Sequence, residues 1–133
     1  PYTGNHGVIR TDFPGGFKGD VVNKFNEEGR TDIENQAFNH IKTLAGIRKE
    51  YISYARLQHY LPNDGLYVFN WKKNDKNLWV FMHFGDKYKK VNITEFKSTD
   101  QRAKVLLGQE LVADWEKVDE IGFEPWDIFV VAF

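Results

Sequence analysis

Residues 8–20 read VIRTDFPGGFKGD, and this stretch decides how the rest of the chain is interpreted. Pro14 fixes its own φ and disfavours a helical conformation at Phe13, while the two glycines that follow permit backbone angles that other residues avoid. Ordinary linkers are small and polar, whereas this loop carries Ile9, Phe13 and Phe17. The stretch therefore predicts an irregular loop whose apolar side chains pack against a surface that the loop does not supply.

The composition is typical of a folded, soluble domain. A chain of 133 residues with 41% hydrophobic content is long and apolar enough for one core. No apolar run approaches the roughly 20 residues that cross a bilayer, so no membrane partner is expected. The net charge of −1 argues against nucleic acid as a partner. The chain has no cysteine, which excludes thiolate chemistry but leaves a bacterial periplasm and a cytoplasm both open.

Charges are distributed unevenly along the second half of the chain. Lysines predominate in residues 71–90, and acidic residues predominate in residues 110–127. We expect solvated faces that partly neutralise each other rather than an ion-binding site.

The most secure local prediction is a helix over residues 32–49. Thr31 and Glu34 have the spacing of a capping box, in which each side chain accepts a hydrogen bond from a backbone N–H at the helix start. Apolar residues then recur at intervals of three and four, which places them on one face. If nothing covers this face, we expect self-association through Ile33, Phe38, Ile41 and Leu44. The whole stripe consists of Ile33, Ala37, Phe38, Ile41, Leu44 and Ala45.

After residue 51 the pattern changes to a period of two, with many β-branched and aromatic residues. Short strands separated by turns favour an antiparallel sandwich. The run from Leu78 to Phe84 is nearly unbroken and predicts a central strand covered on both faces. Trp79 and Trp126 lie in such apolar strands and are expected in the core. The expected strands are residues 56–60, 66–71, 78–84, 89–93, 104–107, 110–112 and 126–133.

Several kinds of site are disfavoured by their spacing. The glycines of residues 15–20 match neither a P-loop nor a dinucleotide fingerprint, and the four histidines form no zinc-binding pair. Neither serine lies in a nucleophile elbow. We therefore expect no cofactor and no metal in this chain. Trp71 and Trp115 border charged turns, and either is a candidate for stacking on a sugar ring.

Residues 10–20 resemble the R-x-D-F-P-G-G-[WF]-x-G-D segment of neopullulanase-like and cyclomaltodextrinase-like α-amylases of glycoside hydrolase family 13. In that family the segment lies late in the (β/α)8 catalytic barrel and precedes a helix with an N-[QE]-A-F core. Residues 35–38 of this chain read NQAF and match that core. Residues 52–133 are similar to the all-β C-terminal domain of these enzymes. Phe17 occupies a position that is often tryptophan in the family.

The resemblance implies an α+β fragment. Residues 1–51 would be the remnant of the barrel, and residues 52–133 an antiparallel β-sandwich domain that supports it. The family's catalytic carboxylates lie on earlier barrel strands, so the chain alone is expected to be inactive. Its partners would be the parent barrel and, in the parent, starch-derived oligosaccharides; an α-glucan-binding sandwich is the alternative function. Arg10, Asp12 and Phe17 are candidate substrate contacts, although the favoured role of Arg10 and Asp12 is to order the loop by hydrogen bonds.

Overall fold

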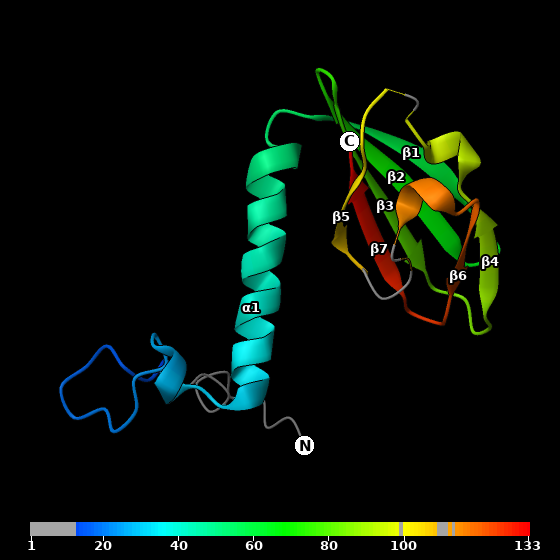
Figure 1. The fold of residues 1–133 in the computed structure, drawn as a ribbon. Coiled ribbons are helices and arrows are strands. Elements are labelled where there is room, and N and C mark those ends of the chain that lie inside the picture. Colours follow the sequence, from blue (N-terminus) through cyan, green and yellow to red (C-terminus); the bar gives the residue numbers. More distant parts are fainter. Residues whose placement is uncertain (1–12, 99, 109–111, 113) are drawn as a thin grey trace. The chain divides into compact units, whose positions relative to one another are not determined.

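The structure is a computed structural model that describes residues 13–98, 100–108, 112 and 114–133, with only the backbone at 61–63. The chain divides into two compact units, Pro1–Leu44 and Ala45–Phe133. No helix in the described part of the chain is long and apolar enough to cross a membrane. Figure 1 labels the helix and the strands of both units.

The first unit contains a loop, the short 3-10 helix η1 (Glu27–Gly29) and most of helix α1 (Asp32–Ile47). The predicted capping box is confirmed, because the Thr31 amide donates to Glu34 Oε2 over 2.8 Å and the Glu34 amide donates to Thr31 Oγ1 over 3.3 Å. The helix ends at Ile47, slightly earlier than predicted, and the chain continues in the π-helical turn η2 (Arg48–Ile52).

No residue of α1 is buried, although its apolar stripe has formed on one face. Ile33 is 78% exposed and Ile41 is 65% exposed. Phe38 and Leu44 are partly exposed, at 46% and 41%. The stripe that the sequence predicts is therefore present as a helix face without a buried side chain.

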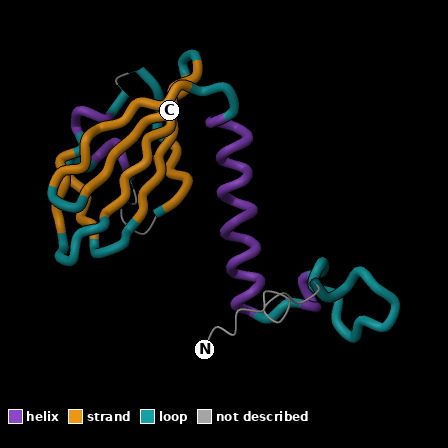
Figure 2. The backbone as a smooth tube through the Cα atoms, turned by 180° about the vertical axis from the view of Figure 1, so that it is seen from behind, coloured by secondary structure: helices purple, strands orange, loops and turns teal. Residues whose placement is uncertain are grey.

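The second unit contains a five-stranded antiparallel sheet in the order β1-β2-β3-β7-β5. Figure 2 shows these strands running side by side. The predicted central position of β3 is confirmed, because β3 pairs with β2 on one side and with β7 on the other. The strands are β1 (Arg56–Asn63), β2 (Leu66–Lys73), β3 (Lys76–His83), β5 (Lys104–Leu107) and β7 (Ile128–Ala132).

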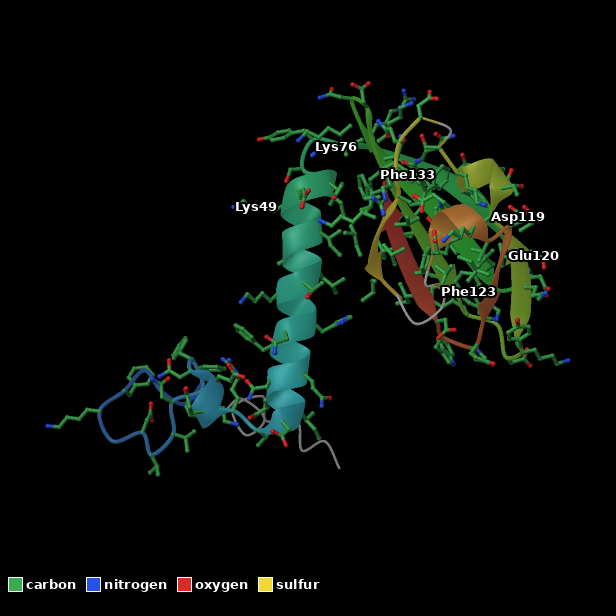
Figure 3. All side chains as sticks on the ribbon, in the orientation of Figure 1. Lys49, Lys76, Asp119, Glu120, Phe123 and Phe133 are labelled. Atoms are coloured by element: carbon green, nitrogen blue, oxygen red, sulfur yellow. The ribbon has the colours of Figure 1, made fainter. Side chains whose placement is uncertain are left out.

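A second sheet of two antiparallel strands, β4 (Lys89–Asn92) and β6 (Glu120–Phe123), shares one hydrophobic core with the first. Phe81 of the large sheet and Phe123 of the small one are both fully buried, with ring centroids 6.2 Å apart. On the same short strand Glu120 lies at the surface (Figure 3), where it pairs with Lys90 at 3.0 Å. This ion pair joins the lysine-rich and the acidic segments, as the charge pattern predicts.

The opposite face of the five-stranded sheet packs against η2. Tyr51 of η2 is buried against Leu78 and Val80 of β3 and Val130 of β7. Strand β3 is thus covered on both faces, which confirms what its apolar run predicts.

Two sequence expectations about strands are wrong. Strand β6 was not expected, because only four residues form it and Gly122 interrupts its short apolar pattern. The last strand begins at Ile128 rather than at residue 126, since Trp126 lies in the preceding turn and is 72% exposed instead of belonging to the core. Residues 110 and 111 of another expected strand lie outside the described residues, and Val112 is buried outside any strand.

One α-helix and seven antiparallel strands within the described residues confirm the α+β class. A barrel origin of α1, the sandwich assignment and a domain boundary after residue 51 stay predictions.

Candidate functional site

The loop that opens the described chain is folded around one carboxylate. Asp20 Oδ2 accepts the backbone N–H of Gly15 over 2.7 Å and that of Phe17 over 3.0 Å. These hydrogen bonds, from Phe17 first and then from Gly15, lower the pKa of the Asp20 carboxyl below its ordinary value. Asp20 is therefore an ordering residue, which holds the two glycines in one conformation.

The loop closes against the segment that follows it. Gly15 has φ +116°, a conformation that favours glycine, and a Cβ there would meet Asn23 Oδ1 at 2.3 Å. The Lys24 amide donates to the Pro14 carbonyl over 3.1 Å. Gly15 is thus required by its positive φ and by the close approach of Asn23, whereas a Cβ at Gly16 would meet only Phe25 Cε2 at 4.0 Å.

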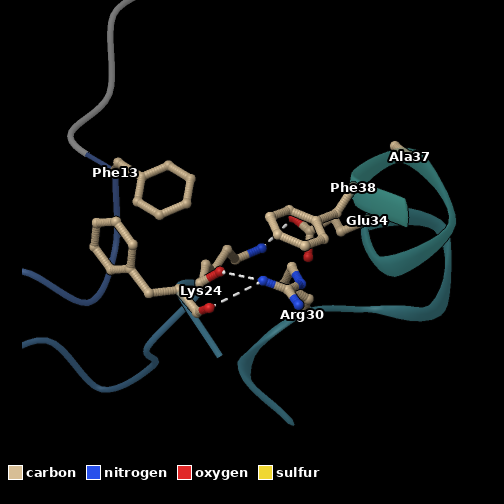
Figure 4. A pocket seen from close by; sticks show the side chains of 7 residues that line it. Phe13, Lys24, Arg30, Glu34, Ala37 and Phe38 are labelled. Atoms are coloured by element: carbon tan, nitrogen blue, oxygen red, sulfur yellow. Dashed lines mark hydrogen bonds and ion pairs between the residues drawn. The ribbon is translucent and has the colours of Figure 1, made fainter. Parts of the chain in front are cut away.

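Arg30 connects the loop to the start of α1. Its Nη1 donates to the carbonyls of Lys24 (3.0 Å) and Phe25 (3.1 Å), and its Nε donates to Asn35 Oδ1 (2.7 Å). Its guanidinium lies beside the Phe38 ring (Figure 4), and the distance from the guanidinium carbon to the ring centre is 4.1 Å. A planar guanidinium suits this combination of forked donation and ring stacking, which an ammonium group does not reproduce.

Lys24 and Glu34 form an ion pair beside this arginine. The hydrogen bond from Lys24, followed by the one from the Thr31 amide, lowers the pKa of the Glu34 carboxyl. Glu34 therefore caps the helix and binds the loop at the same time, and this carboxylate is not left available for acid or base chemistry.

These contacts surround a hollow of about 580 Å³ in the first unit. Phe13 and Phe25 line one part of it with their rings in an edge-to-face arrangement, with centroids 4.9 Å apart. Its lining is mainly aromatic, with the charged groups already paired to one another, so it suits an apolar group better than a polar substrate. The lining residues are Phe13, Lys24, Phe25, Arg30, Glu34, Ala37 and Phe38.

The described residues hold no group of three or more His, Asp or Glu side chains that could bind a metal ion. Arg10 and Asp12, two of the candidate substrate contacts, lie outside the described residues. Phe17 is 72% exposed in the first unit.

The two candidate tryptophans of the second unit are not brought together. Trp71 is half-buried and packs on the cluster that contains Tyr51. Trp115 is 2% exposed and stacks on Phe129 with centroids 5.5 Å apart, so the expectation of an accessible ring there is wrong. The acidic residues around Trp115 suggested a surface position, but the short 3-10 helix η4 (Trp115–Lys117) turns this side chain inward.

No family model matches the chain. Its fold is shared with solved hydrolases. It superposes on trehalose-6-phosphate hydrolase from Bacillus licheniformis with a TM-score of 0.60 at 22% identity, covering 84% of this chain and 21% of that one. An Anoxybacillus α-amylase matches with a TM-score of 0.57 at 14% identity, over 89% of this chain and 26% of that one. AmyP in complex with maltotriose matches with a TM-score of 0.54 at 17% identity, over 86% of this chain and 23% of that one.

These similarities concern the fold. The chain spans about a fifth to a quarter of the length of the structures it matches. The second unit makes up about two thirds of the chain, so matches that cover 84% or more extend into the first unit as well.

Two features of the loop and one of the second unit were not predicted from the sequence. For Asp20, the one sequence signal for its ordering role is that it lies three residues after Phe17, whose amide it accepts. For Arg30, the one signal is that it directly precedes Thr31, which caps the helix. The third feature is the exposed ring of Trp126, whose only sequence signal is the preceding Pro125, a residue typical of turns.

Proposed function

We propose that this chain is the C-terminal part of an α-glucan-degrading glycoside hydrolase of the α-amylase or neopullulanase type. In this role the β-sheet unit supports a catalytic barrel, and the loop and α1 are the last piece of that barrel. The observation that carries the proposal is a loop held by hydrogen bonds to Asp20 and followed by a helix in which no residue is buried. An apolar helix face of this kind is normally stabilised by packing against another surface.

The fold similarities support this reading, since each of them covers most of this chain and only a minor share of a larger hydrolase. The resemblance of residues 10–20 to the family motif favours α-glucan as the substrate class, with hydrolysis of α-1,4 links in starch-derived oligosaccharides and α-1,6 links as a further option. Family members use two carboxylates in a retaining mechanism. In the described part of this chain, Asp20 and Glu34 are committed to backbone and ion-pair contacts, so the chemistry is assigned to residues upstream of the motif.

An assay of sugar release tests the proposal. The purified 133-residue chain is expected to release no reducing sugar from maltoheptaose, pullulan or cyclodextrin, whereas a longer gene product that includes the upstream region is expected to hydrolyse at least one of them. Turnover by the short chain, or an upstream region without a barrel, contradicts the proposal.

The uncovered helix face also leads to a proposal about assembly. Separated from a barrel, the chain is expected to self-associate through Ile33, Phe38, Ile41 and Leu44, because an exposed apolar patch promotes association. Sedimentation at increasing concentration measures this, with Ile41→Lys as the variant that keeps the chain monomeric. A wild-type chain that remains strictly monomeric contradicts it.

An α-glucan-binding module is the second candidate function. A specific observation favours it: the second unit exposes the ring of Trp126 beside that of Phe84.

A further inference from the structure

Two aromatic side chains lie together at one end of the five-stranded sheet. Phe84 follows β3 directly, and Trp126 lies in the turn before β7. Their ring centroids are 6.1 Å apart and their planes meet at 76°, an edge-to-face arrangement that aromatic pairs favour. Trp126 is 72% exposed and Phe84 is 48% exposed, so the pair presents ring surface to solvent.

Backbone hydrogen bonds hold this pair in place. The Trp126 amide donates to the His83 carbonyl over 2.9 Å, and the His83 amide donates to the Asp127 carbonyl over 3.0 Å. Within the turn, the Glu124 amide donates to Asp127 Oδ2 over 2.7 Å. The end of β3 and the turn are therefore tied together, and a ligand would meet rings that are already positioned.

The backbone of Trp126 is in a conformation that a tryptophan rarely adopts. Its φ is +72°, and it follows Pro125 in a turn where glycine or asparagine fits with less strain. Phe84 is its only ring partner among the described residues. Local folding thus gains little from a tryptophan here, and its exposed ring points to a contact outside the domain.

The size of the exposed surface indicates what kind of contact this is. Aromatic side chains of about 150–250 Å² each, at these exposed fractions, offer about 180–300 Å² in total. A stable protein interface takes about 800 Å² from each partner. The pair is therefore too small for a protein partner by itself, and it matches one or two sugar rings. The apolar C–H face of a pyranose suits an aromatic ring, and the exposed Glu124 in the same turn offers an acceptor for sugar hydroxyls.

We infer that Trp126, supported by Phe84, is a stacking platform for an α-glucan chain. The class of ligand rests on the proposed function. The platform lies away from the loop motif in sequence, and it would hold polymeric substrate without taking part in bond cleavage.

The test is binding of maltoheptaose to the full 133-residue chain, measured by isothermal titration calorimetry, with retardation in pullulan-containing gels as a second readout. Trp126→Asn removes the ring and keeps a residue that tolerates positive φ, and it is expected to weaken binding about tenfold or more. Phe84→Ala is expected to weaken it severalfold. Tyr54→Asn is the matched control, because Tyr54 is an exposed aromatic residue with φ +63° that lies outside the pair. It is expected to bind as the wild type does, and circular dichroism checks that all three variants are folded.

The inference is overturned if the wild-type chain does not bind maltoheptaose, or if Trp126→Asn binds as tightly as the wild type. It is also overturned if Trp126→Asn dissolves a dimer that sugar does not affect, since the platform would then contact a second copy. Hydrolysis by the longer gene product is measured separately. Activity there without binding by the short chain rejects the platform alone, whereas binding without any activity rejects the proposed enzyme.

Discussion

Replacing Phe123 with alanine tests whether the two sheets of the second unit are held together as the structure shows. Phe123 is fully buried and lies against Phe81 across the shared core. A phenylalanine side chain of about 200 Å², at about 25 cal/mol per Å², contributes about 5 kcal/mol, of which alanine keeps roughly 1. The expected loss is therefore about 4 kcal/mol, within the range of about 3–5 kcal/mol found for such substitutions.

In a unit of this size, 1 kcal/mol corresponds to a shift of about 4–8 °C in Tm, so Phe123→Ala is expected to lower Tm by about 15–30 °C. Thermal unfolding followed by near-UV circular dichroism measures the shift, since the cluster around Phe81 is rich in aromatic rings. Phe84→Ala is the control, because by the same area arithmetic its half-exposed ring should cost about 2 kcal/mol, half as much as Phe123→Ala. If Phe123→Ala melts within a few degrees of the wild type, the two sheets do not pack through this side chain.

Three further predictions concern the loop, the helix start and a strained residue. Thr31→Ala removes half of the capping box and is expected to destabilise the first turn of α1 by about 1 kcal/mol, seen as amide exchange about fivefold faster there; unchanged exchange would refute the capping role. The pKa values of Asp20 and Glu34 are lowered from 3.8 and 4.5 in the folded chain. The stabilisation by their carboxylates is therefore fully present above pH 3.8 and 4.5, respectively, and is lost as the pH falls through the lowered pKa of each group. NMR of the Gly15 and Phe17 amides down to about pH 2 should show this loss, and shifts that do not change with pH would contradict it. Tyr54→Asn relieves positive φ at an exposed site and is expected to raise Tm by a few degrees; a lower Tm would show that the ring stabilises the fold.

Local signals explain what the sequence predicted well. The helix start follows from Thr31 and Glu34, two side chains three residues apart that need no distant partner. The central strand follows from its unbroken apolar run, because burial on both faces removes the need for alternation.

What the sequence did not predict depends on contacts between distant residues. Trp115 and Trp126 both border polar positions, yet the first is buried under Phe129 and the second is exposed in a turn. The four residues of β6 form a strand because they pair with β4, about thirty residues earlier in the chain. The role of Arg30 arises because the loop returns to the helix start and places two carbonyls within reach of its guanidinium.

The central claim is that the apolar face of α1 belongs against a catalytic barrel, and Ile41→Ala tests it most directly. Ile41 is 65% exposed here, so at concentrations where the 133-residue chain is monomeric the substitution should leave the free energy of unfolding within about 0.5 kcal/mol, helped by the higher helix propensity of alanine. In the longer gene product the same substitution should cost about 2–5 kcal/mol, because Ile41 would be buried. Lys42→Ala, one position along the helix, is the control and should have little effect in either protein. A small and equal effect of Ile41→Ala in both would contradict the account.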